Sequence, residues 1–461
     1  MREFIKITLF STVIYFVSWL VVYSLGINSL SIQSEDTIPS MFLPVSIIKD
    51  KTLYADKYYD LIIKSYPHPD DKDYSLGLTP FYFRKAGPHY ITAFPIISGL
   101  LALPIFALPL MFGMSISWLN VTVLSHLTSA ITVGLSGSIL FIFLSKHLLK
   151  DRKKVFLLTL IYLFGTINYA LVSQALWQHG ALQLFIILSL YYLYEKKWFM
   201  TGLTVGLAVL SRPTAIYFVP FVFLIFINQL IEEISDIKIN KRQLTNILIY
   251  FFGLLLTFLF FAWYTKRFYL NISNNGYSDQ ILVNWLSRFP EGFLGLWLSP
   301  SKGILVYSPI FIFSLIGIYL LFKNKEWKKK SSFIYIASFG LVVTHTLILG
   351  KWKHWYGGWS FGYRMAADVI PFLIISMIPF MKSVYFKKYI KVFSILLVIS
   401  VAVQIYGMIF FDGIWHAAYD LGFENTKWLW SIKDSELIFN IRRLLVKLGH
   451  LEKACPSCLP G

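Results

Sequence analysis

Residues 91–113 read ITAFPIISGLLALPIFALPLMFG, an apolar run long enough to cross a membrane. A helix needs about 20 consecutive apolar residues to span the hydrocarbon of a bilayer. Pro95, Pro104 and Pro109 interrupt this run, and each disturbs the hydrogen bonding of a helix. We therefore expect a bent segment that lies in, or dips into, one leaflet, where protein covers its broken backbone. Whether this segment crosses decides the side of every later loop.

The composition of the whole chain is that of a helical membrane protein. Of its 461 residues, 56% are hydrophobic and 18% are aromatic, whereas soluble proteins usually contain about 45–50% apolar residues. The formal charge is +18, from 42 Lys and Arg against 24 Asp and Glu. Most cations lie in short connectors between apolar runs, a pattern that orients membrane helices. The charge therefore does not predict a nucleic-acid partner.

These basic connectors predict the topology. If they are cytoplasmic and 91–113 does not cross, about eleven helices span the membrane, with the N-terminus inside and the C-terminus outside. We interpret the N-terminal run as a retained helix because no small-residue cleavage site follows it. The connectors are 146–154, 196–197, 238–242, 323–330 and 382–391. The expected spans lie near 5–25, 118–145, 155–172, 180–195, 198–212, 213–230, 246–266, 304–322, 331–349, 367–381 and 391–411.

The sequence thus predicts an all-α polytopic membrane protein. Residues 1–410 would form its transmembrane domain, with juxtamembrane helices in a first outer loop at 26–117. Residues 411–461 would form a short non-cytoplasmic tail. Cys455 and Cys458 could form a local disulfide or, with His450, part of a zinc site. A frayed tail without a role is the simpler interpretation.

The outer loops predicted by this topology hold the polar residues that suit chemistry. Glu35 and Asp36 follow the first helix, and paired carboxylates can act as a general base or hold a divalent cation. A solvated acidic turn is the alternative. Arg212 interrupts two apolar runs, which is costly unless it is paired or reaches the lipid headgroups. Trp177 and His179 lie in SQALWQHG, where an ordinary interfacial histidine is the simpler interpretation.

Two more outer loops suggest anion binding. In GLWLSPSKGILVYSP, at 295–309, Lys302 stands before a helix, where N–H groups and a cation can bind an anion; an ordinary turn fits equally. The stretch GKWKHWYGGWSFGYRMAADVIPF, at 350–372, sets cations and glycines among aromatic rings. An interfacial aromatic belt explains its tryptophans but not its cations on the outer face. We expect a phosphosugar clamp there, with the phosphate on Arg364 and His354 and the sugar against Trp355, Tyr356 or Trp359.

The order of these motifs resembles the GT-C class of polyprenyl-phosphate-dependent glycosyltransferases, near the protein O-mannosyltransferases and lipid A aminoarabinose transferases. The resemblance covers residues from about 34 to 372. It is carried by SEDTIPSMFLPVSIIKDKTLYADKY, FPIISGLLALP, ALWQHG, GLTVGLAVLSRPT, GLWLSPSKGILVYSP and WYGGWSFGYRMAADVIPF. This chain lacks the sizeable soluble C-terminal domain of the larger relatives, which leaves the acceptor open.

The resemblance implies roles for individual residues. An acidic residue of the first outer loop is the acceptor-activating base in that class, which corresponds to Asp36 with Glu35 beside it. The bent segments of the first loop correspond to juxtamembrane helices. Basic residues of the later loops bind the lipid-linked phosphate, and the matching positions are Arg364, Lys302, Arg212, His354 and, more loosely, His179.

The expected reaction is transfer of one sugar, with inversion, from a polyprenyl phosphate in the membrane lipid to a glycan, lipid or protein acceptor. The expected place is the non-cytoplasmic face of the plasma membrane, with Trp177 as a further sugar-stacking ring. A divalent cation at Glu35 and Asp36 is the one cofactor that the sequence suggests. The alternatives are a flippase for lipid-linked glycans, which would need charges at mid-membrane, and a glycan polymerase or ligase, which gives no reason for the early carboxylates.

Overall fold

The computed structural model describes residues 2–28, 32–232, 241–271, 274, 277 and 283–451. The chain is 73% helical. Within the described part, the strands form one hairpin, in which β1 (Phe83–Ala86) pairs antiparallel with β2 (His89–Thr92). The expected all-α class is therefore confirmed.

Among the described residues, seven helical segments are long and apolar enough to cross a membrane. An eighth is added if α6 (Arg152–Phe164) and the bent segment after it, which includes α7 (Ile167–Ala170), form one span. The expected count of eleven is not confirmed, because three expected spans coincide with the shorter helices α8 (Gln178–Tyr194), α9 (Trp198–Ser211) and α15 (Ile312–Lys323). The seven segments are Arg2–Ser24, Trp118–Leu148, Pro213–Ile231, Lys241–Tyr269, Lys330–Gly350, Arg364–Lys382 and Ile390–Phe410.

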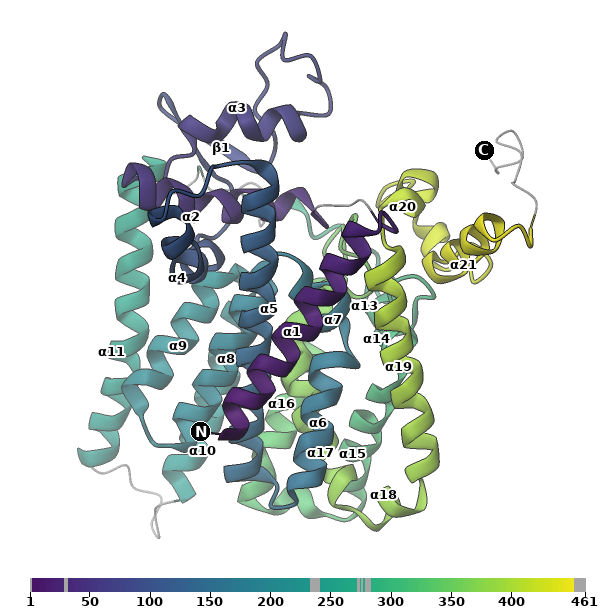
Figure 1. The fold of residues 1–461 in the computed structure, drawn as a ribbon. Helices are drawn as coiled ribbons and strands as arrows, with labels where there is room; N and C mark the ends of the chain where they lie inside the picture. The colour runs from purple at the N-terminus through teal and green to yellow at the C-terminus, as the bar shows by residue number, and fades with distance from the viewer. Residues whose placement is uncertain are drawn as a thin grey trace.

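The long helices run side by side along one axis, and most connections lie at the two ends of this bundle (Figure 1). One end carries the β hairpin and several short helices, and we call it the loop end. The start of α1 and the short helix α18 (Val384–Lys388) lie at the opposite end. The α-helices that belong to the seven candidate spans are α1 (Arg2–Ser24), α5 (Trp118–Phe143), α10 (Phe218–Glu232), α11 (Lys241–Tyr264), α16 (Phe333–Gly350), α17 (Ile370–Lys382) and α19 (Ile390–Phe410).

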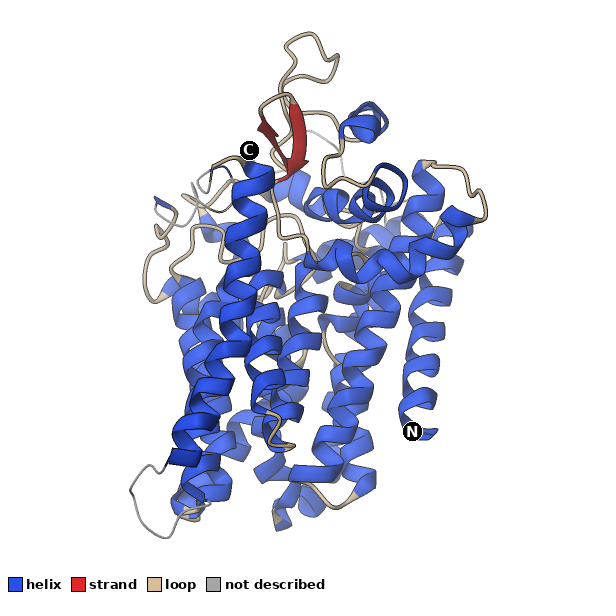
Figure 2. Cartoon of the chain, turned by 90° about the vertical axis from the view of Figure 1, so that its left-hand side faces the viewer, coloured by secondary structure: helices blue, strands red, loops and turns tan. Residues whose placement is uncertain are grey.

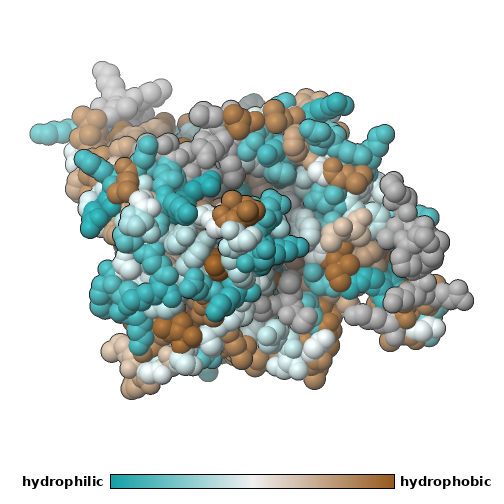
Figure 3. Space-filling view, turned by 90° about the horizontal axis from the view of Figure 1, so that it is seen from above, coloured by the Kyte–Doolittle hydropathy of each residue, from teal (hydrophilic) through white to brown (hydrophobic). Residues whose placement is uncertain are grey.

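The apolar run at 91–113 folds at the loop end. Its first residues belong to β2, and Pro104 and Pro109 lie inside α4 (Ile97–Met111). α4 packs against α2 (Ile38–Asp50), and both helices run across the bundle axis, as does α3 (Asp56–Ser65) (Figures 1 and 2). Seen from above, this end presents many hydrophilic residues, with apolar patches between them (Figure 3).

Glycines allow close helix contacts in the bundle. α9 packs against α11 through Gly202, where a Cβ would lie 1.9 Å from the Tyr250 carbonyl oxygen. Gly253 on α11 makes the reciprocal contact, because a Cβ there would lie 2.3 Å from the Phe199 carbonyl oxygen. Small residues permit such approach between helices that lipid surrounds, where burial of apolar surface gives little driving force.

The C-terminal segment folds back onto the loop end instead of trailing away from it. It forms α20 (Ile414–Tyr419), a 3-10 turn at Thr426–Leu429 and α21 (Glu436–Lys447). Trp415, Trp428 and Leu429 are buried there against the short helix α13 (Glu291–Leu298) and the loop that follows α16. The frayed tail expected around Cys455 and Cys458 lies outside the described residues.

Candidate functional site

An ion pair between Asp36 and Arg364 is the first of three polar groups near the loop end. Asp36 lies in the 3-10 helix Glu35–Thr37 before α2, where the Ser34 hydroxyl accepts a hydrogen bond from its N–H at 3.3 Å. Arg364 begins η10 (Arg364–Val369), the 3-10 helix that leads into α17. Its Nη2 donates to Asp36 Oδ2, and each side chain is 17% exposed. The pair is shielded but still reaches the surface.

Further contacts hold the guanidinium group of Arg364. It lies over the ring of Trp177, 4.4 Å from the ring centre, at a distance typical of a cation–π contact. Nη1 donates to the Gly357 carbonyl at 3.2 Å. Gly357 has φ +84°, and a Cβ there would lie 3.2 Å from Arg364 Cβ, so glycine lets the loop wrap the arginine. Within the described part, Arg364 Nε is buried without a hydrogen-bond partner.

A second carboxyl group, Glu35, and a small cavity lie near this ion pair. Burial raises the pKa of Glu35 above its usual 4.5, and the neighbouring charge of Asp36 raises it further. Beside Trp177, a cavity between α4, α5 and α8 has a volume of about 10 Å³, which is room for about one water molecule. This cavity is therefore too small to hold a ligand much larger than water.

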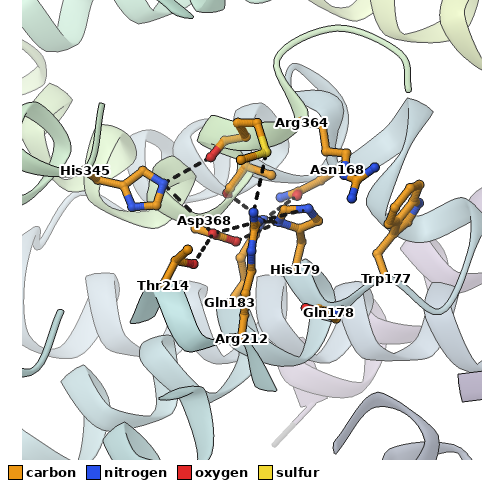
Figure 4. A network of polar contacts seen from close by, with 12 residues as sticks. Asn168, Trp177, Gln178, His179, Gln183, Arg212, Thr214, His345, Arg364 and Asp368 are labelled. Carbon is orange, nitrogen blue, oxygen red and sulfur yellow. Dashed lines mark hydrogen bonds and ion pairs between the residues drawn. The ribbon is translucent and has the colours of Figure 1, made fainter. Parts of the chain in front are cut away.

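Asp368 organises the second group, which is buried (Figure 4). Its Oδ1 lies 2.7 Å from His179 Nδ1, and its Oδ2 lies 2.9 Å from Arg212 Nη1. Thr214 donates to Oδ2 at 3.4 Å, and His345 Nε2 lies 4.0 Å from the same oxygen. Arg212 is thus paired inside the protein, which accounts for an arginine between two apolar runs.

Asp368 and His345 are functional candidates that the sequence analysis missed. Each is the one charged or imidazole side chain of an apolar run, MAADVIPF and LVVTHTLIL, and the sequence analysis assigned neither a role. The one available signal was the charge itself, because an ionisable residue inside an apolar run is costly and needs a partner. Gln183 extends the same buried group by donating to Asn168 Oδ1 and the Ala367 carbonyl, both at 2.9 Å.

Lys302 and Glu436 form the third group together with His416. Lys302 Nζ donates to the Ser360 carbonyl, lies 2.9 Å from His416 Nε2 and lies 3.6 Å from Glu436 Oε2. Glu436 Oε2 also accepts from the Tyr307 hydroxyl at 2.9 Å. The side chains of Lys302 and Glu436 are buried. Lys302 is therefore engaged by the C-terminal segment, and it would have to leave these partners to bind a phosphate.

The aromatic residues expected to face a sugar differ in exposure. Trp355 is fully buried against Gly295, where a Cβ would lie 2.2 Å from its ring, so its faces are covered by protein. Tyr356 is also buried, with its hydroxyl 3.0 Å from His354 Nδ1. The stacking roles predicted for Trp355 and Tyr356 do not fit this structure. Trp359, in contrast, is 54% exposed.

The predicted site residues thus fall into three groups, and residues 360–368 contribute to each of them. Arg364 joins Asp36 and Trp177, Arg212 joins His179 through Asp368, and Lys302 joins the segment through the Ser360 carbonyl. In the part of the chain described here, there is no group of three or more His, Cys, Asp or Glu side chains placed to hold a metal ion. The suggested cation at Glu35 and Asp36 would compete with Arg364 for Asp36.

No protein-family model, curated protein or solved structure matches this chain.

Proposed function

We propose that this protein is an integral membrane glycosyltransferase that moves a sugar from a polyprenyl-phosphate donor to a hydroxyl or amine acceptor. One observation carries the proposal: Asp36 and Arg364 are 328 positions apart and form an ion pair at the loop end that still reaches the surface. A carboxylate beside a phosphate-binding cation is what such a displacement needs. The apolar helices around it suit a donor that is half lipid.

In the proposed reaction, Asp36 accepts the proton of the acceptor while the acceptor atom bonds to the anomeric carbon. The bond from that carbon to the phosphate oxygen breaks, and the phosphate leaves with the electron pair. Arg364 stabilises the charge that gathers on the leaving phosphate. Attack from the face opposite the phosphate inverts the anomeric centre.

The ion pair implies an order of binding in this scheme. Arg364 Nη2 is not free for a phosphate while it donates to Asp36 Oδ2, and that oxygen is not free to accept a proton from the acceptor. Donor phosphate would replace Asp36 at Arg364 and thereby free the carboxylate for the acceptor. Donor therefore binds before acceptor.

The test is turnover of a purified polyprenyl-phosphate sugar by reconstituted protein. A positioned base contributes about 10²–10⁴-fold, so Asp36→Asn should lose about that rate while it binds donor at least as tightly as the wild type. Glu35→Gln is the matched control and should lose much less. Wild-type turnover by Asp36→Asn would remove Asp36 from the reaction.

We place the loop end on the non-cytoplasmic side, because the connectors rich in lysine lie at the opposite end. Lys72 and Lys328 are exposed at the two ends. In a background without Cys455 and Cys458, a membrane-impermeant thiol reagent added to intact cells should label Lys72→Cys and spare Lys328→Cys. The reverse labelling would overturn this placement.

A second candidate function, transport of the same lipid-linked sugar, is favoured by the buried charges around Asp368. Buried ionisable groups between membrane helices often mark transport pathways. The two functions differ in one product, because a transferase releases polyprenyl phosphate and a transporter returns the donor intact. Chromatography of the lipid fraction after turnover separates them.

A further inference from the structure

Helix α21 has an apolar face that the described protein leaves uncovered. Ile438, Ile441 and Leu448 are 37%, 42% and 60% exposed. Their spacings of three and seven residues place them on one side of the helix and its C-cap. Three exposed aliphatic side chains in a row are not a random scatter on a surface helix.

Two arginines of α21 attach the helix to the protein. Arg443 forms two hydrogen bonds to Asp412, at 3.0 and 2.7 Å, and Arg442 lies 3.1 Å from Asp434. Residues 427–448 contain five Lys or Arg and two Asp or Glu, a net charge of +3. The two ion pairs fix the orientation of the helix, and Lys427 and Lys433 add charge beside it.

The apolar face of α21 lies near the end of α19, a helix with exposed apolar side chains. α21 projects sideways at the loop end, near the level where α1 and α19 end (Figure 1). α19 exposes Ile395, Val398 and Ile399, by 58%, 66% and 43%. A bilayer that surrounds α19 would therefore have its headgroup region at the height of α21.

We propose that α21 is a membrane-surface helix that lies in the headgroup region of the leaflet at the loop end and prefers anionic lipid. Its apolar stripe would insert among the upper acyl chains, while the exposed Lys427 and Lys433 would face lipid phosphates. Amphipathic helices with these two features bind at this depth, and their affinity rises with anionic lipid. The proposal does not depend on the chemistry at Asp36.

This surface is connected to the loop that carries Arg364. Glu436, the first residue of α21, accepts a hydrogen bond from the Gly362 N–H at 3.4 Å, two residues before Arg364. Glu436 also contacts Lys302 and Tyr307. Lipid binding by α21 therefore also holds the loop that ends at the ion pair.

The depth of α21 can be measured with nitroxide labels on the full chain, with Cys455 and Cys458 replaced by serine. Nanodiscs of phosphatidylcholine with phosphatidylglycerol serve as the bilayer, and collisions with oxygen and with a water-soluble nickel complex report depth. Ile441→Cys should have an oxygen-to-nickel ratio several-fold above that of the water reference Lys72→Cys and below that of Val398→Cys, which lies near the middle of α19. A ratio equal to that at Lys72 would overturn the proposal.

Two further measurements, a change of lipid composition and the mass of the purified protein, distinguish lipid from a second copy of the protein at the apolar stripe. Removing phosphatidylglycerol should raise nickel access at position 441, and Lys427→Gln with Lys433→Gln should abolish that dependence. Depth that is the same in both lipids would overturn the anionic preference. If the label is shielded from both reagents and the purified protein has the mass of a dimer, the apolar stripe binds a second copy and the proposal is wrong.

Discussion

The helix η10 holds two aspartate–arginine pairs that differ in burial. Arg364, at its start, pairs with Asp36, and each side chain is 17% exposed. Asp368, four positions later, pairs with Arg212, and their side chains are 0% and 7% exposed. The chemistry of the two pairs is the same. From this difference in burial we expect the pair at Asp36 to exchange its partner for a ligand and the pair at Asp368 to hold the helix in place.

The physical basis of this contrast is solvation. Removing one partner of a buried pair leaves a bare charge and costs about 3–5 kcal/mol. A pair near the surface contributes about 0–1 kcal/mol, because water replaces the lost partner. The pair around Asp368 should therefore determine stability, and the pair around Asp36 should determine activity.

The largest expected effect is that of Asp368→Asn. It leaves Arg212 buried without a counter-charge, so the free energy of unfolding should fall by about 3–5 kcal/mol. Denaturant unfolding in a defined detergent measures the change. Replacing both partners, as Arg212→Met with Asp368→Leu, should recover part of the loss. Wild-type stability in Asp368→Asn would mean that the two pairs do not differ as burial implies.

Arg364→Ala should have the opposite profile. Loss of one donor to a developing negative charge typically lowers kcat about 10²–10³-fold, while stability should fall by less than in Asp368→Asn, because water can reach the remaining Asp36 carboxylate. Arg364→Lys keeps the charge but loses the planar fork, so it should recover only part of kcat. Steady-state assays and unfolding curves on the same preparations measure both quantities. Unfolding of Arg364→Ala with unchanged kcat in the folded fraction would reverse the two roles.

A smaller effect is expected at Trp177, whose ring contacts the guanidinium of the exchangeable pair. A cation–π contact is worth about 0.5–2 kcal/mol, so Trp177→Leu should weaken donor binding by a few-fold to tenfold or slightly more. Trp177→Phe should retain part of the affinity, because it keeps an aromatic face. Trp263→Leu, at a 58% exposed position on α11, is the control and should leave donor binding unchanged. Equal affinity in all three variants would show that the ring only fills space.

The sequence predicted most of the helices and placed Asp36 and Arg364 on the same face. Apolar runs were sufficient for α1, α5 and α19, since length and hydropathy alone define a candidate span. The direct ion pair between Asp36 and Arg364 was not predicted and comes from the structure. The count of eleven spans is not confirmed, because helices such as α9 are shorter than a candidate membrane span.

The remaining features depend on tertiary contacts that leave no local signal. Asp368 looks like an isolated charge until Arg212 is brought beside it from another helix. Glu436 lies in a segment that seemed to be a tail, and only the fold places it against Lys302. Trp355 and Trp359 are equivalent in sequence, yet the packing of Gly295 buries the first.

The smallest expected effect is a pH dependence at Glu35, beside the exchangeable pair. Burial and the charge of Asp36 raise the pKa of Glu35 above its usual 4.5, so the folded protein keeps this proton at a pH where the unfolded chain has lost it. The folded state then binds more protons, and stability falls as pH rises from about 4.5 through the folded pKa. Glu35 is partly exposed, so the slope should be slight. Glu35→Gln removes the titration and should flatten this part of the profile. Denaturant unfolding at closely spaced pH values measures the slope, and an unchanged slope in Glu35→Gln would assign the dependence to another group.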